Sequence, residues 1–105
     1  MSPILTEKEF SKHVNTKFRI ALEPPVLLEL SEVKSYLPRE NEERGMERFS
    51  LYFAGPREPS LPQHVYPMEH ELMGPFDIFL VPVSQDENGF RYEAVFNYYK
   101  EKAVD

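Results

Sequence analysis

A chain of 105 residues, 41% of them hydrophobic, is large enough for one packed domain and too apolar for a disordered protein. It has no cysteine, which excludes disulfide bonds, thiolate metal sites and cysteine nucleophiles. The net charge of −6, with arginine and glutamate alternating over 39–48, argues against nucleic-acid binding. No apolar run approaches the roughly 20 residues of a membrane helix, and residues 1–10 lack a signal-peptide core. We therefore expect a cytoplasmic protein without membrane contact.

The first predicted element is a short helix over Glu7–Val14. Thr6 can cap its start, and Glu9 follows three residues later, where its carboxylate can reach back to the Thr6 amide. Phe10 supplies the apolar stripe of this helix, and Asn15 is a suitable stop. The sequence therefore predicts one capped helix that lies on a larger body.

The rest of the chain alternates apolar and polar residues, which is the period of a half-buried strand. The predicted strands cover residues 16–23, 26–37, 47–54, 64–69, 76–84 and 90–98. The alternation changes phase near Ser31 and Glu32, which predicts a β-bulge there. The run 76–83 is nearly all apolar, as in a strand covered on both faces, and Pro82 places its second half at an edge or a bulge.

Turn signals separate these strands. Asp86–Gly89 predicts a tight hairpin, because Asn-Gly tolerates positive φ angles, so the last two strands should pair antiparallel. Gly55–Gln63 carries three prolines and is predicted to be a rigid surface loop. Six strands and one helix indicate an all-β fold over residues 1–105. It should be a mainly antiparallel barrel or sandwich with one short N-terminal α-helix. Periodicity alone does not distinguish barrel from sandwich.

Several segments together resemble one family signature. They are 49–56, Leu61-Pro62-Gln63 with Tyr66 and His70, Met73-Gly74, Phe79-Leu80-Val81-Pro82-Val83, and Gly89 through Tyr92-Glu93-Ala94-Val95-Phe96-Asn97. Over most of its length the chain resembles a family of small bacterial proteins classed only as a domain of unknown function. The resemblance supports the domain boundary and implies no catalytic residue. Some members of that family are encoded near phage-tail-like collar proteins, which implies an assembly or accessory role.

The three histidines do not form an evident metal site. His64 and His70 fall on one face of a strand, but six residues of extended chain place them about 20 Å apart. His13 would have to arrive from the helix. We expect instead that His70 caps the turn before Gly74. No metal ligand and no cofactor-binding residue is predicted.

Nucleophile motifs are also missing from the sequence. There is no Gly-x-Ser-x-Gly elbow, no His-Glu-x-x-His motif and no glycine-rich phosphate loop. The serines at 31, 35, 50, 60 and 84 have no recognisable acid–base neighbourhood. Glu93 and Asp77 are candidates for a carboxylate pair across strands, although an exposed charge pattern explains them better. The balance is therefore against an enzyme, and no catalytic residue is predicted.

We expect a non-enzymatic protein-interaction or accessory module of a larger bacterial assembly. Its predicted partner contacts are Arg57, Glu58 and Leu61 in the proline loop, since binding residues favour loops fixed on a rigid scaffold. Leu61 could instead tuck into the core, and the loop could simply cap one end of the sheet. The outward face of Arg91, Glu93, Val95 and Asn97 is either a further contact surface or an ordinary solvent-facing strand. No oligomeric state follows from the sequence.

The alternative is a small β-barrel that binds or converts a small molecule in an aromatic-lined mouth. Its predicted contacts are Tyr66, His70 and Tyr92. A closed interior filled with side chains favours the interaction module, whereas an open cavity of several hundred Å³ favours the ligand binder.

Overall fold

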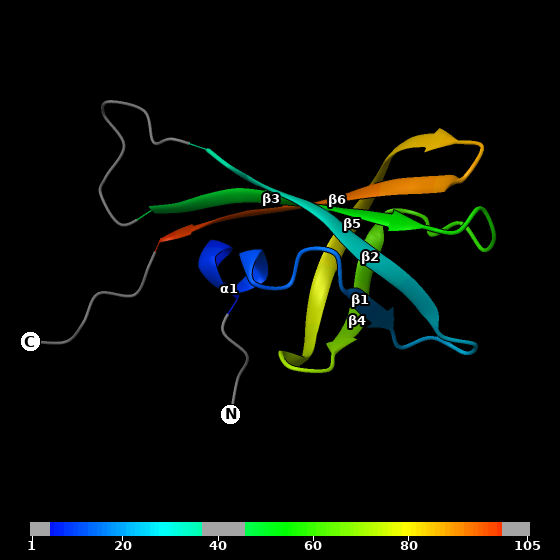
Figure 1. Cartoon of the computed structure of the whole chain (residues 1–105), viewed down its shortest axis with the longest axis horizontal. Coiled ribbons are helices and arrows are strands. Elements are labelled where there is room, and N and C mark those ends of the chain that lie inside the picture. The colour runs from blue at the N-terminus through cyan, green and yellow to red at the C-terminus, as the bar shows by residue number, and fades with distance from the viewer. Residues whose placement is uncertain (1–4, 37–45, 100–105) are drawn as a thin grey trace, which may run out of the picture.

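The computed structural model describes residues 5–36 and 46–99 (Figure 1). They form α1 (Glu7–Ser11), β1 (Lys17–Ile20), β2 (Val26–Ser35), β3 (Met46–Gly55), β4 (His64–His70), β5 (Gly74–Asp86) and β6 (Gly89–Tyr99). β1 is shorter than the predicted range 16–23, whereas the other strands differ from prediction by at most two residues at each end. Residue 37, the charged stretch 39–45 and residues 100–105 lie outside the described residues.

The six strands form one closed antiparallel sheet in the order β1-β2-β3-β6-β5-β4, with β4 returning to β1. This confirms the all-β, antiparallel prediction with one short helix, and it resolves the choice in favour of a closed sheet. The closure is uneven. β3 and β6 pair from Met46↔Tyr99 to Gly55↔Phe90, whereas β4 meets β1 only at Arg19↔Glu69 and Ile20↔Met68. We call the line of pairing between two strands a seam, so the barrel has a long seam between β3 and β6 and a very short one between β1 and β4.

Both predicted irregularities of the strands are present. The register of β2 against β3 shifts between Leu30 and Glu32, which confirms the bulge. The register of β5 against β6 shifts between Pro82 and Ser84, so Pro82 does lie at a bulge. The expectation that β5 is covered on both faces is wrong, because Phe79 is 47% exposed. No second layer covers the outer face of this strand within the described part of the chain.

The inward face of the barrel is filled by large apolar side chains. Ten of them have no exposed surface: Phe18, Ile20, Leu28, Leu30, Phe49, Leu51, Phe53, Met68, Leu80 and Tyr92. They come from every strand of the sheet, and each contributes about 1.5–3 kcal/mol of burial free energy. The interior is thus a packed core.

α1 packs where β5 and β6 separate. The pairing of these two strands runs from Asp86↔Gly89 to Val81↔Glu93. Beyond that point the Phe10 ring stands 5.8 Å from the Phe76 ring of β5 and 5.6 Å from the Phe96 ring of β6. Phe10 has no exposed surface. The helix therefore places the Phe10 ring between β5 and β6. We call this position, which the Phe76 and Phe96 rings border, the aromatic notch.

The N-cap of α1 is as predicted, but the helix is shorter than predicted. Thr6 Oγ1 accepts the Glu9 amide at 3.1 Å, which confirms the N-cap. The helix ends at Ser11 rather than Val14, because the amides of Lys12 and His13 bond three residues back, to Glu9 and Phe10. Such bonds tighten the last turn.

The chain then reverses at Asn15, the predicted stop, whose φ is 72°. The Asn15 amide donates to the Leu30 carbonyl of β2 at 2.7 Å, so the turn after the helix is fastened to the barrel. The Glu9 carboxylate does not face the Thr6 amide as predicted. Its two oxygens lie 3.2 Å from Lys12 Nζ and 3.4 Å from His13 Nε2.

Candidate functional site

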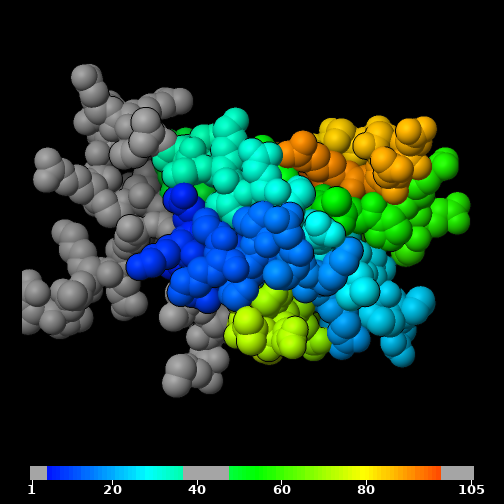
Figure 2. Space-filling view, in the orientation of Figure 1, coloured from blue at the N-terminus to red at the C-terminus, as the bar shows by residue number. Residues whose placement is uncertain are grey.

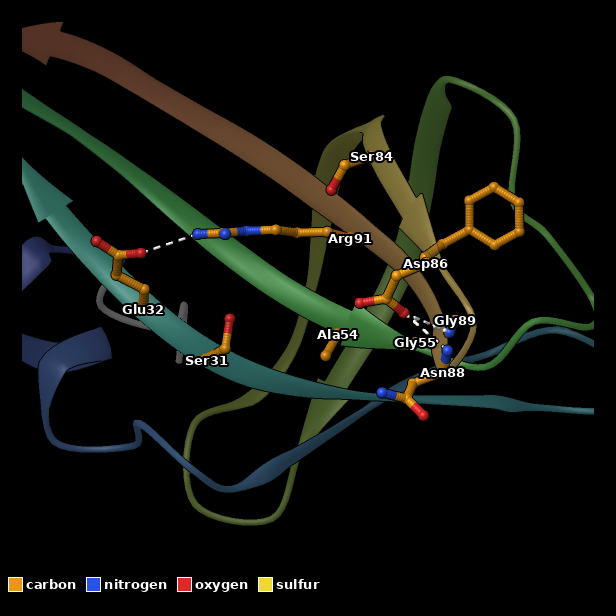
Figure 3. Close-up of a pocket in the computed structure, with 10 residues that line it drawn as sticks. Ser31, Glu32, Ala54, Gly55, Ser84, Asp86, Asn88, Gly89 and Arg91 are labelled. Carbon is orange, nitrogen blue, oxygen red and sulfur yellow. Dashed lines mark hydrogen bonds and ion pairs between the residues drawn. The ribbon is translucent and has the colours of Figure 1, made fainter.

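A groove of about 510 Å³ opens at the barrel end that carries the β5–β6 turn (Figure 3). We call it the hairpin groove. It is lined by Ser31, Glu32, Ala54, Gly55, Ser84, Asp86, Asn88, Gly89, Phe90 and Arg91. These residues come from β2, β3, β5, β6 and the turn, so the groove depends on the closed sheet. Six of these ten residues have polar side chains, and the lining is polar and apolar in about equal parts.

The turn of the predicted hairpin is held by a side chain. Asp86 Oδ1 accepts the amides of Asn88 at 2.8 Å and Gly89 at 3.1 Å, and Asp86 pairs with Gly89 across the ladder. The predicted hairpin is therefore confirmed. Within the turn only Gly89 has a positive φ, of 152°, so the expected positive φ at Asn88 is not used. The Asp86 carboxylate compensates by satisfying the turn amides, as aspartate commonly does.

Arg91 forms one wall of the hairpin groove by reaching across a neighbouring strand. Arg91 belongs to β6, and its guanidinium lies 4.3 Å from the ring centroid of Tyr52 on β3. The same guanidinium forms an ion pair with Glu32 on β2 at 2.8 Å (Figure 3). The Arg91 and Glu32 side chains are each about half exposed, so the ion pair contributes at most about 1 kcal/mol. The stacking on Tyr52 and the ion pair with Glu32 together orient the Arg91 side chain.

A partly buried polar network lies beside this wall. Ser50 Oγ donates to Glu93 Oε2 at 2.8 Å, and the Tyr52 hydroxyl donates to the same oxygen at 3.2 Å. The Tyr36 hydroxyl lies 3.0 Å from Ser50 Oγ. The prediction that Ser50 lacks an acid–base neighbourhood is therefore wrong. Ser50 has no exposed surface, however, so its hydroxyl cannot reach a substrate at the surface.

The network changes the chemistry of Tyr52. Burial, followed by the hydrogen bonds with Tyr36 and Glu93, raises the pKa of Tyr52 to about 12. Its phenol is thus held protonated as a donor to Glu93. The proposed pairing of Glu93 with Asp77 is wrong. Glu93 pairs with Val81 of β5, whereas Asp77 pairs with Pro67 of β4.

The proline loop lies next to the hairpin groove. Arg57, Glu58 and Ser60 are exposed, and they line a second groove of about 600 Å³ together with Gln85 and Phe90. Phe90 is partly buried and borders both grooves. The structure thus brings two of the three predicted partner contacts to the same barrel end as the hairpin.

The third predicted contact, Leu61, is part of the core. It is 4% exposed, and its amide donates to the Tyr92 hydroxyl at 2.9 Å. The Tyr66 hydroxyl donates to the Pro62 carbonyl of the same loop. Leu61 therefore anchors the loop, as the second interpretation of this residue anticipated, and does not present its side chain to a partner.

The three side chains of the predicted ligand mouth do not line a common opening. Tyr66 and Tyr92 are buried, and both hydroxyls bond the backbone of the proline loop. His70 lies at the other end of β4, where its Nδ1 accepts the amides of Leu72 at 3.0 Å and Met73 at 3.3 Å. This confirms that His70 caps the turn before Gly74.

His13 lies beside His70, a contact that the sequence did not predict. The two ring centroids are 4.5 Å apart. Across residues 5–36 and 46–99, no three histidine, aspartate or glutamate side chains gather in an arrangement that would hold a metal ion. Buried side-chain nitrogens and oxygens in the same residues all have hydrogen-bond partners.

These features define a small closed antiparallel barrel with a packed interior and polar grooves at one end. The family model described as "Domain of unknown function (DUF6916)" matches residues 5–96, and the chain belongs to this family. No curated protein and no solved structure matches the chain. The helix in the described part of the chain is too short to cross a bilayer.

Proposed function

We propose that this protein is a non-enzymatic interaction module that binds another protein at the barrel end formed by the hairpin groove and the tip of the proline loop. The observation that supports this choice is the distribution of space in the molecule. The interior is occupied by side chains without exposed surface, whereas the grooves of about 510 and 600 Å³ lie at the surface. A filled small barrel offers no interior binding site.

The residues at this end suit a protein partner. Phe90 borders both grooves, Arg91 lines the hairpin groove and Arg57 lines the second groove. Aromatic residues and arginine are the types enriched in protein interfaces and in their energetic hot spots. Glu58 and Asp86 add negative charge, so the surface carries both signs and would select a partner by charge complementarity.

The proline loop is ordered before any partner binds. Tyr92 and Tyr66 bond its backbone at Leu61 and Pro62, and Leu61 is packed in the core. Its exposed tip, with Arg57 and Glu58, is thus held on a fixed base. A loop that is already fixed loses little conformational entropy on binding.

Within this proposal the partner is a component of a larger bacterial assembly, and the protein works in the cytoplasm. The support is the resemblance to a family of small bacterial proteins, some members of which are encoded near phage-tail-like collar proteins. The cysteine-free composition is compatible with a reducing compartment.

Site-specific crosslinking in native host cells would test the docking surface. A photoreactive amino acid is placed at Arg57, and a matched one at Lys17, which is exposed on β1 at a distance from both grooves. We expect position 57 to yield a defined crosslinked protein that position 17 does not. The Arg57→Ala, Glu58→Ala double variant should lose that partner while its unfolding free energy stays within about 0.5 kcal/mol of wild type. Equal crosslinking at both positions, or full retention by the double variant, would contradict the proposal.

A polar small molecule is the second candidate, because a volume of about 510 Å³ is within the range of ligand pockets. Its site would be the hairpin groove and not the aromatic mouth predicted from sequence. Amide shift mapping with a library of polar metabolites would support it if shifts are confined to residues such as Asn88, Gly89 and Arg91. Shifts spread over the whole sheet would count against it.

A further inference from the structure

Two histidines that are distant in the sequence meet beside α1. His13 follows the helix and His70 ends β4, and both are 7% exposed. Their ring centroids lie 4.5 Å apart. Figure 2 shows the segment that follows α1, in blue, against the β4–β5 turn, in yellow-green. The two rings therefore join the helix segment to this turn.

The hydrogen bonds of His70 define its protonation state. Nδ1 accepts the amides of Leu72 and Met73. Nε2 lies 2.9 Å from Thr16 Oγ1, whose own hydrogen is donated to the His13 carbonyl at 2.6 Å. Because Nδ1 is an acceptor and the threonine hydrogen is already used, the ring must be neutral with its hydrogen on Nε2.

A second proton on His70 is incompatible with this arrangement. Protonated Nδ1 would become a donor that points at two other donors, the amides of Leu72 and Met73, which would lose their acceptor. The charged ring would also be buried beside His13, whose ring centroid lies 4.5 Å away. Burial, and secondarily His13, lower the pKa of His70.

The charged groups around the two rings do not reverse this preference. Glu71 favours a charged His70, but its side chain is exposed and screened by water. Glu9 contacts His13 at 3.4 Å and also pairs with Lys12. The remaining charged side chains beside His70 are Lys17, Arg19 and Glu69, which line the adjoining cavity together with Glu71. Arg19 pairs with Glu69 and Lys17 pairs with Glu29, so these charges are already compensated.

The same contact holds the helix on the barrel. Thr16 Oγ1 lies 2.9 Å from His70 Nε2, and the segment 13–16 directly follows the helix whose Phe10 ring fills the aromatic notch. We propose that the His13–His70 contact is an acid-sensitive latch. Protonation of His70 releases the segment after α1, withdraws Phe10 and exposes the Phe76 and Phe96 rings of the aromatic notch to solvent.

Hydrogen exchange of wild-type protein at pH 7.5 and pH 5.0 would test the latch, with protection factors corrected for intrinsic exchange. The reporters are the amides of Asn15 and Met73, which bond Leu30 and His70, and the reference is Leu51 in the core. If His70 takes its proton only in the released state, with an ordinary histidine pKa near 6.5, release becomes up to about 30-fold more favourable at pH 5.0. We expect the protection of both reporters to fall by roughly this factor while Leu51 is unchanged.

The matched variant is His70→Asn, because the amide oxygen of asparagine can accept the turn amides and has no proton to gain. Its reporters should keep the same protection at both pH values. Binding of a hydrophobic dye should rise at pH 5.0 in wild type and not in the variant. Unchanged wild-type protection at pH 5.0 would overturn the latch even if the variant failed to fold. An equal loss of protection in wild type and variant would overturn it as well.

Discussion

Gly89 in the β5–β6 turn lies directly against the carbonyl group of Gly55 at the end of β3. A Cβ atom on Gly89 would stand 2.0 Å from the Gly55 oxygen, which no side chain tolerates. Gly55 is constrained by side chains instead, since its own Cβ would stand 2.6 Å from Leu28 Cδ2 and 3.1 Å from Tyr92 Cε2. The missing Cβ at Gly89 lets the turn close over the end of β3, and the missing Cβ at Gly55 leaves room for Leu28 and Tyr92.

Gly89→Ala should therefore be strongly destabilising. We expect a loss of about 2–4 kcal/mol, from overpacking against fixed backbone together with the strain of a positive φ on a residue with a Cβ. The measurement is the urea midpoint at constant m-value. Gly74→Ala is the matched control, because Gly74 has a φ of 80° but open space around its Cβ position. It should cost only about 1–2 kcal/mol. Equal losses in the two variants would contradict the close approach of Gly89 to Gly55.

Phe10→Ala should lower the unfolding free energy by about 3–5 kcal/mol, the usual loss for a buried phenylalanine. The reason is that its ring contacts rings from β5 and β6 where these strands no longer pair. Chemical denaturation of wild type and variant gives the value. Leu72→Ala, at a site that is 76% exposed, is the control and should change stability by less than about 0.5 kcal/mol. A loss at Phe10 no larger than this control would mean that the helix is not needed to fill the aromatic notch.

Thr6→Ala should cost about 1 kcal/mol, because it removes the acceptor of the Glu9 amide in the first turn of α1. Thr6→Ser keeps a hydroxyl at the same position and should recover most of the loss. Both variants are compared with wild type by their urea midpoints. If alanine and serine give the same midpoint, the hydroxyl does not stabilise the start of the helix.

The protein should lose stability in alkali as Tyr52 ionises. Its pKa is about 12 in the folded protein, against 10.0 for an unperturbed tyrosine, so unfolded chains release this proton first as the pH rises. The contribution of Tyr52 to stability is therefore complete below pH 10 and declines between about pH 10 and 12. NMR titration of the tyrosine ring carbons should find Tyr52 still protonated at pH 11. Glu93→Gln removes a neighbouring negative charge and should lower this pKa, and a Tyr52 midpoint near 10 in wild type would contradict the network.

The architecture was largely predictable because it follows local alternation. Phe49, Leu51 and Phe53 alternate with outward residues in the sequence and point inward in the barrel. The bulge after Leu30 was visible because one extra residue shifts the phase of the pattern. The outer face of β5 was not predictable. An apolar side chain such as Phe79 looks the same in a sequence whether a second layer covers it or water does.

The polar contacts were not predictable for a different reason. Ser50 and Glu93 are 43 residues apart in the sequence, and they meet only because β3 pairs with β6. His13 and His70 come into contact because β1 pairs with β4, and no spacing in the sequence predicts this pairing. The hairpin groove combines residues from four strands in the same way. Its one local signal was the turn at Asp86–Gly89, whose residue types are specific enough to be identified alone.

The strand order has a consequence for how the chain folds. β1, β2 and β3 pair with their sequence neighbours, as do β4, β5 and β6, so each half can begin as a local meander. The long seam between β3 and β6 joins residues as distant as Met46 and Tyr99. Closing such separations costs loop entropy before any contact compensates for it, and this slows folding. Because β6 pairs with both β3 and β5, the barrel cannot close on the ribosome before this strand has emerged.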